Sequence, residues 1–444
     1  MHASQRVFGT SEWALRAPAA LAGVFMVPAM AWVAARWLGR ETAAPAAWLA
    51  AASPFLVRYS QESRGYAWVM LGTCVSVALL LEARRRCDVR TVGAWFAATV
   101  FGALSNPSFA LLAPLQLRLW LGGEPATRRA RLGWLAAVTV AIVLLAAPFA
   151  PPMLRTWDWR RLAPARGPVE GESPLRGRTT LHPGAIPFAL HSFAVGMTLG
   201  PSLREPRSDL GAATFRRHAA ELVAVTMVFG AAGILGLRAL ARRRRRIDAL
   251  VWLAAPALVV VYFAAQNFKV FNPRYLAVSA PAFLLVVAAG WADCGARGRR
   301  LLGGGIAVLW ALSLFHHYFD PRYAREDYRA ALAAVREAHV PGEQVLAVGA
   351  MEPVDFYGRG LPVEHLWLGF AADSTRMGRE LDAVLSRASG TWVVLSRADD
   401  LDPAGRFARR MQQIATGGPE EYSGVRVWHV TRRPAGAQVP PGPR

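Results

Sequence analysis

Two short polar clusters interrupt the apolar runs of this sequence, and the first is "VRYSQESRGYAW". Its arginines, Arg58 and Arg64, can each donate paired hydrogen bonds to a phosphate, a task that suits the planar guanidinium group. Glu62 can hold a divalent metal ion or accept hydrogen bonds from sugar hydroxyls, and Tyr59 and Tyr66 can stack on a sugar ring. The same composition also fits an ordinary loop at a membrane interface, where aromatic residues form a belt.

The second cluster is "QNFKVFNPRYLAV", which brings Lys269, Arg274 and Tyr275 to the start of an apolar run. Lys269 is the only lysine of the chain, and every other Lys or Arg position holds arginine. Either Lys269 supplies a compact point charge that arginine cannot supply, or a coding bias that favours arginine has left this one lysine by chance. Pro273 is expected to begin a helix, because proline favours the first helical position. Together the two clusters can surround an anionic headgroup.

A longer segment, "LHPGAIPFALHSFAVGMTLGPSLREP", contains further candidate ligands: His182, His191, Arg204 and Glu205. No metal-binding spacing such as HExxH accompanies them, and a structural role is favoured for either histidine. The sequence also lacks a Walker loop, a GxSxG elbow and a dinucleotide fingerprint.

The composition points to a membrane protein. The 444 residues are 54% hydrophobic and 18% charged, whereas soluble domains carry about 25% charged residues. The formal net charge of +21 does not indicate a nucleic-acid partner, because the arginines occur in short groups between apolar runs. The three cysteines imply no disulfide framework.

The apolar runs approach the roughly 20 residues that cross a bilayer about 30 Å thick. We predict spans at 17–38, 43–57, 66–82, 91–105, 107–121, 132–150, 219–241, 248–265, 274–292 and 301–316. With ten spans, five arginine groups fall on one side: Arg36 with Arg40, and those at 83–86, 128–131, 242–246 and 297–300. Because positive charge is retained in the cytoplasm, both polar clusters, the N-terminus and the C-terminal region are expected on the outer face.

This pattern divides the chain into three parts. We expect a transmembrane domain at 1–318 with a long outer loop at 151–218, an extracytoplasmic α/β domain at 319–434, and a disordered tail at 435–444. Within the α/β domain, periodicity predicts helices at 326–338, 375–388 and 403–415, and strands at 344–349, 391–396 and 425–430. The fold class is thus a polytopic α-helical membrane protein with a small C-terminal α/β domain.

Several stretches resemble a known family. "FGTSEWALRAPAALAGVFMVP", "SPFLVRYSQESRGYAW" and "NPRYLAVSAPAFLL" resemble membrane glycosyltransferases of family 39. This is the GT-C group, which includes protein O-mannosyltransferases and lipid A aminoarabinose transferases. "FAVGMTLGPSLRE" and "FDPRYAREDYRAA" look like a bacterial branch with a periplasmic C-terminal domain. The resemblance covers almost the whole chain, and the YSQE-x-RGY loop is its most specific element.

The resemblance implies transfer of a sugar, with inversion, from a polyprenyl-phosphate-linked donor. The acceptor would be a protein, lipid or glycan on the outer face of a bacterial inner membrane. Phosphate-binding candidates are Arg58, Arg64, Lys269 and Arg274. Candidates for contacting sugar or acceptor, or for orienting the loop, are Tyr59, Glu62, Tyr66, Asn106, Arg204, Glu205 and Tyr275. A divalent metal held by Glu62 is a possible cofactor. The expected partners are the lipid-linked donor, membrane lipids and the acceptor, without nucleic acid.

One element of the family pattern is missing from this sequence. Family members carry the catalytic base as the first residue of an Asp-Glu pair, in the loop after their first span. That loop would precede "FGTSEWALR", where only "MHASQRV" stands, and Glu12 does not match the catalytic position. We therefore expect this sequence to lack the first span and the base. Asn106 also stands where many relatives have histidine before proline.

Two alternatives to transfer remain open. One is a non-catalytic membrane protein of the same fold that binds a lipid-linked sugar. The other is a transporter or flippase for a lipid-linked glycan. A transporter is expected to place polar residues in mid-span, whereas here they concentrate in the outer loops, which favours an enzyme.

Overall fold

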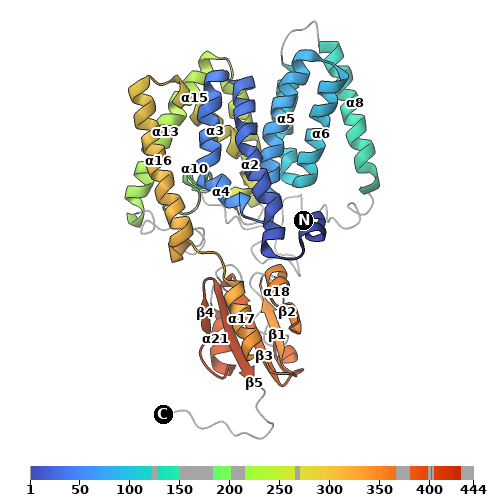
Figure 1. Ribbon diagram of the computed structural model, residues 1–444, viewed down its shortest axis with the longest axis vertical. Helices are drawn as coiled ribbons and strands as arrows, with labels where there is room; N and C mark the ends of the chain where they lie inside the picture. Colours follow the sequence, from blue (N-terminus) through green and yellow to red (C-terminus); the bar gives the residue numbers. More distant parts are fainter. Residues whose placement is uncertain are drawn as a thin grey trace. The chain divides into compact units, whose positions relative to one another are not determined.

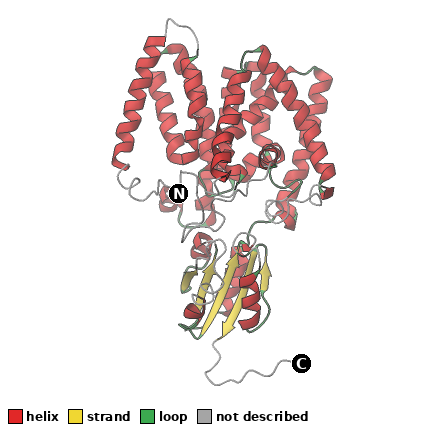
Figure 2. Cartoon of the chain, turned by 180° about the vertical axis from the view of Figure 1, so that it is seen from behind, coloured by secondary structure: helices red, strands yellow, loops and turns green. Residues whose placement is uncertain are grey.

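The computed structural model describes residues 2–122, 128–149, 184–201, 216–265, 271–349, 351–366, 381–398, 402 and 405–431. These residues form two compact units. Among the described residues, the first contains those up to Gly200 together with Arg216–His316, and the second contains Pro201 and those from His317 onwards. The first unit is helical, and the second is built around a sheet (Figure 2).

The first unit is a bundle of apolar helices (Figure 1). Its described elements are α1 (His2–Phe8), α2 (Glu12–Trp37), η1 (Arg40–Thr42), α3 (Ala43–Ala52), α4 (Pro54–Ser60), α5 (Tyr66–Arg86), α6 (Val89–Ser105), η2 (Pro107–Leu112), α7 (Ala113–Leu121), α8 (Arg128–Ala146), η4 (Ala147–Phe149), α10 (Ala185–Val195), α13 (Ala219–Arg242), α14 (Arg246–Ala265), η6 (Pro273–Ser279), α15 (Ala280–Asp293) and α16 (Ala296–Phe319). Each of the ten predicted spans coincides with one or two of these helices.

Six helical segments in the described part are long and apolar enough to cross a membrane: α2, α5, α13, α14, Pro273–Asp293 and α16. The remaining predicted spans correspond to shorter or divided helices. The span predicted at 43–57 is divided into α3 and α4, because Pro54 lacks an N–H and Ser53 caps a new helix. The class predicted from the sequence, a polytopic helical membrane protein, is confirmed.

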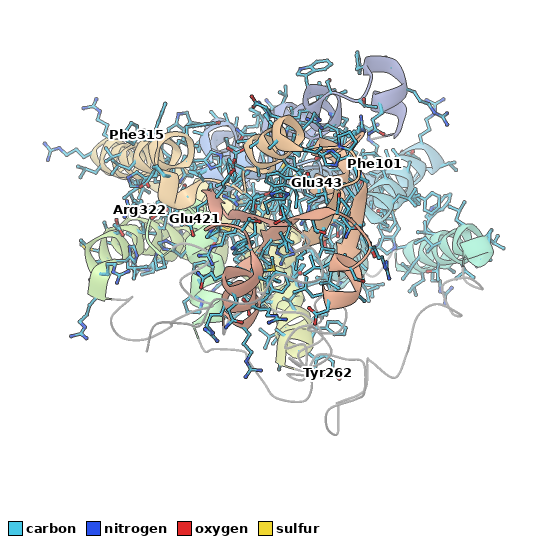
Figure 3. All side chains as sticks on the ribbon, turned by 90° about the horizontal axis from the view of Figure 1, so that it is seen from below. Phe101, Tyr262, Phe315, Arg322, Glu343 and Glu421 are labelled. Carbon is cyan, nitrogen blue, oxygen red and sulfur yellow. The ribbon has the colours of Figure 1, made fainter. Side chains whose placement is uncertain are left out.

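Apolar side chains cover the outside of the bundle. Phe101 of α6, Tyr262 of α14 and Phe315 of α16 are each well exposed (Figure 3). Large apolar surfaces of this kind are costly in water and indicate contact with another apolar phase. In a polytopic helical protein that phase is lipid.

The arginine groups meet at one end of the bundle. Arg36 at the end of α2 pairs with Glu82 of α5 at 2.9 Å, and Arg118 of α7 pairs with Asp248 of α14 at 2.8 Å. Arg242 at the end of α13 pairs with Asp293 at the end of α15. These ion pairs, with that of Arg243 and Glu41 of η1 at 2.8 Å, bring the C-terminal ends of α2, α5, α7, α13 and α15 to this end of the bundle. We call it the arginine-rich end. Its expected location in the cytoplasm stays a prediction.

The second unit is an α/β fold with one five-stranded sheet. Its described elements are η7 (Pro321–Tyr323), α17 (Tyr328–Ala338), β1 (Gln344–Val348), α18 (Met351–Tyr357), β2 (Val363–Leu366), β3 (Gly390–Ser396), α21 (Arg406–Ile414), β4 (Glu420–Tyr422) and β5 (Val425–Thr431). The strand order is β2-β1-β3-β5-β4. β1 runs parallel to both β2 and β3, whereas β5 is antiparallel to β3 and to β4.

The predicted strands correspond to β1, β3 and β5, and the predicted helices at 326–338 and 403–415 correspond to α17 and α21. Residues 381–385 of the helix predicted at 375–388 are helical, and 375–380 lie outside the described residues. β2 and β4 were not predicted, since they are only four and three residues long. The tail at 435–444 also lies outside the described residues.

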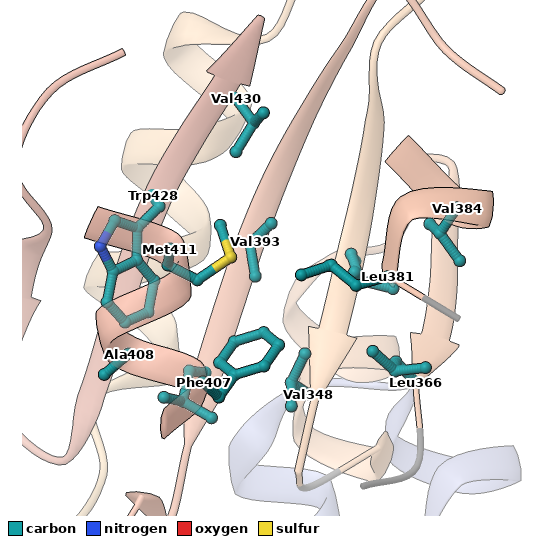
Figure 4. Close-up of a cluster of buried hydrophobic side chains, with 12 residues drawn as sticks. Val348, Leu366, Leu381, Val384, Val393, Phe407, Ala408, Met411, Trp428 and Val430 are labelled. Carbon is teal, nitrogen blue, oxygen red and sulfur yellow. The ribbon is translucent and has the colours of Figure 1, made fainter. Parts of the chain in front are cut away.

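Two apolar clusters cover the two faces of this sheet. Phe407 and Met411 of α21 pack with Val393 and Trp428 on one face (Figure 4). On the other face, α17 and α18 contribute Leu332 and Val354, among others. The alternation of strand side chains between two covered faces explains why β3 reads as a continuous apolar run in the sequence.

A half-buried carboxylate, Glu343, joins the turn before β1 to strands β3 and β5 of the second unit. Glu343 accepts hydrogen bonds from Trp392 Nε1 and His429 Nε2, both at 2.8 Å, and from the backbone N–H of Val340 at 3.0 Å. The rings of Trp392 and His429 stack with centroids 4.2 Å apart. Burial raises the pKa of Glu343, but the hydrogen bonds from these donors outweigh it and hold the pKa below its ordinary value.

The first prediction concerns the close contact of α13 and α15. A Cβ atom on Gly236 would lie 2.0 Å from the carbonyl oxygen of Val286, so Gly236→Ala should force the two helices apart. We expect a loss of about 1–3 kcal/mol of stability, measured by thermal unfolding of the full chain in detergent. The control is Gly233→Ala in the same helix, where a Cβ meets nothing within 4 Å. Equal midpoints for the two variants would show that the close contact is not present.

The second prediction follows from the lowered pKa of Glu343. A depressed carboxyl pKa stabilises the folded state above about pH 5, and this stabilisation is lost as the pH falls through the depressed value. In Glu343→Gln the thermal midpoint of the full chain should therefore fall less steeply between about pH 6 and pH 3. Glu337→Gln, on the exposed side of α17, is the control and should keep the wild-type slope. An unchanged slope in Glu343→Gln would contradict the prediction.

Candidate functional site

The first polar cluster is positioned by the short helix α4 and the loop that follows it. Ser53 Oγ accepts a hydrogen bond from Leu56 N–H at 3.4 Å, and Pro54 occupies the first helical position. Both are typical signals for the start of a helix. α4 therefore presents Arg58 and Tyr59 in its last turn, and α5 begins after the loop at Tyr66.

Close backbone packing fixes this loop against the end of α6. A Cβ atom on Gly65 would lie only 2.1 Å from the carbonyl oxygen of Ser105. Asn106, the next residue, caps η2 through its Oδ1, which accepts from Ser108 N–H at 2.9 Å. The structure thus explains why glycine stands at 65 and gives Asn106 a capping role. A ligand-contacting role for Asn106 stays a prediction.

The second polar cluster lies at the same end of the bundle, and its helix η6 begins with the same kind of asparagine cap as η2. Asn272 caps η6 with its Oδ1, which accepts from Arg274 N–H at 3.1 Å, and Pro273 takes the first helical position. The helix start predicted at Pro273 is confirmed. Sequence reasoning missed the role of Asn272, although the Asn-Pro pair that it shares with Asn106 is a visible signal.

Arg274 links the two clusters. Its guanidinium interacts electrostatically with Tyr59 and Tyr66 of the first cluster, and its Nη2 donates to Tyr275 Oη at 3.4 Å. Its Nε is buried, and no group in the described part of the chain accepts a hydrogen bond from it. A buried N–H of this kind is costly when it has no acceptor, so this edge of the guanidinium is suited to an anionic ligand.

The tyrosines of the first cluster form part of the protein interior. Tyr59 is 2% exposed, and its ring makes edge contacts with Phe55 and Tyr66 at centroid distances of 4.8 and 5.3 Å. Little of this ring is left to stack on a sugar. We therefore expect Tyr59 to support the loop beneath a ligand, and Tyr66, at 9% exposure, to do the same.

The charged side chains of the first cluster differ in their surroundings. Arg58 Nε lies 3.8 Å from Glu62 Oε1, and both side chains are largely covered. Arg64 is exposed and lies within electrostatic reach of Tyr66. The loop therefore offers one covered arginine with a carboxylate beside it and one exposed arginine at its tip.

The segment that follows α10 packs against the start of α4. Gly196 has a φ of +71°, and a Cβ there would lie 3.0 Å from Pro54. Thr198 Oγ1 donates to the carbonyl of Ser313 at 2.7 Å, which ties this segment to α16. His191 Nε2 lies 2.8 Å from the carbonyl oxygen of Leu199, in agreement with the structural role favoured for it.

Four predicted residues have no structural description: Lys269, Arg204, Glu205 and His182 lie outside the described residues. Of the predicted set, the structure brings together Arg58, Tyr59, Glu62, Arg64, Tyr66, Arg274 and Tyr275. Among the described residues, no group of three or more histidine, cysteine, aspartate and glutamate side chains is placed to hold a metal ion. Glu62 lies beside Arg58 instead.

Comparisons with known proteins agree with this architecture. Residues 1–151 match the dolichyl-phosphate-mannose-protein mannosyltransferase family. The crystal structure of ArnT from Cupriavidus metallidurans, bound to undecaprenyl phosphate, is 15% identical with a TM-score of 0.59, and the match covers 98% of this chain and 87% of that one. No curated protein matches the sequence significantly.

Two other solved structures are similar at a lower level. The oligosaccharyltransferase of Archaeoglobus fulgidus, tethered to an acceptor peptide, is 12% identical with a TM-score of 0.48, over 97% of this chain and 64% of that one. The mycobacterial arabinofuranosyltransferase AftD is 14% identical with a TM-score of 0.47, over 97% and 36%.

The chain thus shares its fold with ArnT along nearly its whole length. Together with the family match over its first 151 residues, this likeness supports the GT-C fold that the sequence resemblance predicts. The resemblance found in the sequence is confirmed at the level of the fold.

The third prediction tests the cap that positions Arg274. Asn272→Ala removes the acceptor of the Arg274 N–H and should cost about 1 kcal/mol of stability, measured as the thermal midpoint of the full chain in detergent. Asn272→Ser should restore most of this loss, because a serine hydroxyl is also a good N-cap acceptor. If alanine and serine behave alike, the cap does not hold this turn.

Proposed function

We propose that this protein transfers a sugar from a polyprenyl-phosphate-linked donor to an acceptor at the outer face of a bacterial cytoplasmic membrane. The observation that carries the proposal is the environment of Arg274. Its buried Nε lacks an acceptor among the described residues, and it lies beside the cluster that holds Arg58 and Arg64. The ArnT structure, which shares the fold, was determined with undecaprenyl phosphate bound.

Arg274 and Arg64 are the proposed ligands of the donor phosphate. The leaving group of the reaction is a lipid phosphate, so negative charge increases on its oxygens as the sugar departs. Guanidinium groups fixed by a capped helix and a packed loop stabilise that charge without reorganising. Arg58, which is covered and lies beside Glu62, is proposed to add positive electrostatic potential at the phosphate. Lys269 is a further proposed phosphate ligand.

Glu62 is the proposed orienting residue of the loop. Its backbone carbonyl accepts a hydrogen bond from Arg64 N–H at 2.7 Å, and its carboxylate lies beside Arg58. It therefore pairs with the Arg58 side chain and holds the backbone turn that carries Arg64. Tyr275 and Asn106 border the same region and are proposed to contact sugar or acceptor, as are Arg204 and Glu205. A metal at Glu62 is not needed for these roles, and the described residues supply no ligand set for one.

The reaction also needs a carboxylate that removes the proton of the acceptor hydroxyl. We assign no described residue to this role. Glu12, the first acidic residue, pairs with Arg16 in the first turns of α2 at 3.5 Å. The sequence expectation that the base belongs to an Asp-Glu pair preceding Phe8 stays a prediction.

The fourth prediction tests the phosphate ligands by transfer of labelled sugar from a polyprenyl-phosphate donor in membranes containing the full chain. Arg64→Ala and Arg274→Ala each remove charge-assisted hydrogen bonds worth about 1.5–3 kcal/mol, so transfer should fall about 10- to 150-fold. Arg274→Lys should recover part of the loss, because it restores charge without the paired geometry. The control is Arg90→Ala, an exposed residue of α6 at the arginine-rich end.

Unchanged transfer by both alanine variants would contradict the phosphate assignment. If the wild-type chain binds polyprenyl phosphate in an Arg274-dependent way but transfers no sugar, the proposed enzyme activity is wrong. The non-catalytic binding protein would then be the better description.

A further inference from the structure

Two turns with the same pattern, Asn-Pro followed by a polar and then an aromatic residue, begin η2 and η6. In η2, Asn106 Oδ1 accepts a hydrogen bond from Ser108 N–H at 2.9 Å, and in η6, Asn272 Oδ1 accepts one from Arg274 N–H at 3.1 Å. The backbone carbonyl of each asparagine also accepts from the N–H of the aromatic residue three positions later, at 3.0 Å in both turns. Ser108 and Arg274 therefore occupy equivalent positions.

The two turns belong to one site. η2 packs against η6, and α5 packs against both. A Cβ atom on Gly65, just before α5, would lie 3.6 Å from Asn106 Cβ. Tyr66, the next residue, interacts electrostatically with Arg274. The turn that carries Ser108 is thus joined to the candidate site through the start of α5.

The Ser108 hydroxyl is left unpaired, as is the Nε of Arg274. Its Oγ is buried, and no group in the described part of the chain forms a hydrogen bond with it. A buried hydroxyl without a partner costs free energy. Two fully buried serines of the same bundle are satisfied, because Ser192 and Ser279 donate to backbone carbonyls at 2.8 and 3.2 Å. Stability of the free chain therefore does not explain the hydroxyl of Ser108.

The backbone beneath Ser108 is held in place, whereas its hydroxyl is not. Phe109, the next residue, is 3% exposed, and its ring lies 2.3 Å from where a Cβ of Gly102 would be. This close contact anchors the turn on α6. A serine side chain can turn between three staggered rotamers. Since no described partner holds the Ser108 hydroxyl, turning towards a ligand breaks no hydrogen bond to the described part of the chain.

We propose that the Ser108 hydroxyl donates a hydrogen bond to the same phosphate that Arg274 binds. This inference rests on the proposed function and adds an uncharged phosphate ligand to it. A phosphate oxygen is a strong acceptor, and a hydrogen bond to a charged acceptor is stronger than one between neutral groups. The two equivalent turns then each supply one donor, a hydroxyl and a guanidinium N–H, and the single phosphate satisfies both.

The test measures binding of undecaprenyl phosphate to the full chain in detergent, from the dependence of the thermal midpoint on its concentration. In Ser108→Ala the affinity should fall about 10- to 150-fold. Without the ligand, the midpoint of this variant should be equal to or above that of the wild type, because an unpaired buried hydroxyl has been removed. Ser108→Thr keeps a hydroxyl and should retain most of the affinity.

The matched control is Ser192→Ala, which removes a buried hydroxyl that is already paired within its own helix. It should lower the midpoint without ligand and leave the affinity unchanged. A second measurement places Ser108→Ala in the Arg274→Lys chain. If both side chains bind one phosphate, the loss of affinity on removing the hydroxyl should be smaller there than in the wild type.

The outcomes separate this inference from the proposed function. Wild-type affinity in Ser108→Ala, with affinity still reduced in Arg274→Ala, would overturn the role of Ser108 and leave the phosphate site in place. Equal losses on removing the hydroxyl from the wild type and from Arg274→Lys would show that the two residues do not share a phosphate. Wild-type affinity in both Ser108→Ala and Arg274→Ala would overturn the phosphate assignment itself.

Discussion

The structure of the first unit depends on the cost of placing a charged side chain in an apolar phase. An arginine at the centre of a bilayer costs roughly 2.5–3.5 kcal/mol on insertion scales. The chain meets this constraint by collecting its arginines at helix ends. At one end, Arg36, Arg118 and Arg242 are paired with carboxylates across helices. At the other end, Arg274 keeps a buried Nε without an acceptor in the described part of the chain. Among the described residues, the candidate site therefore keeps one buried edge of a guanidinium group without an acceptor from the protein.

Precise backbone contacts hold that charge in position. Gly65 brings the loop of the first cluster against the backbone of Ser105, and Asn272 fixes the turn that carries Arg274. Behind them, Gly196 and its neighbours pack on Pro54 at the start of α4. Arginine side chains are long and flexible, so a phosphate site made from them is selective only if the backbone beneath is rigid. The capped turns and the glycine contact provide this rigidity, and they connect the fold to the proposed chemistry.

Much of this arrangement could be predicted from the sequence. Hydropathy located the helices because lipid-facing surfaces must be apolar, and the arginine groups indicated that the two polar clusters share an end. The sequence could not indicate that Tyr59 is buried, because its cover comes from Phe55 and Tyr66 through the fold of α4 and α5. It also could not indicate that Glu62 lies beside Arg58, a contact that favours the orienting role among those predicted for Glu62. Short strands such as β4 leave too little periodicity to be recognised.

The central claim is that the end of the bundle that carries the two polar clusters binds the phosphate of a polyprenyl carrier. The most direct measurement is a cryo-electron microscopy structure of the full chain with undecaprenyl phosphate. We expect density for the phosphate within hydrogen-bonding distance of the Arg274 guanidinium, with Arg64 turned towards it. Density for the phosphate beside Arg84 at the arginine-rich end, with none beside Arg274, would contradict the claim.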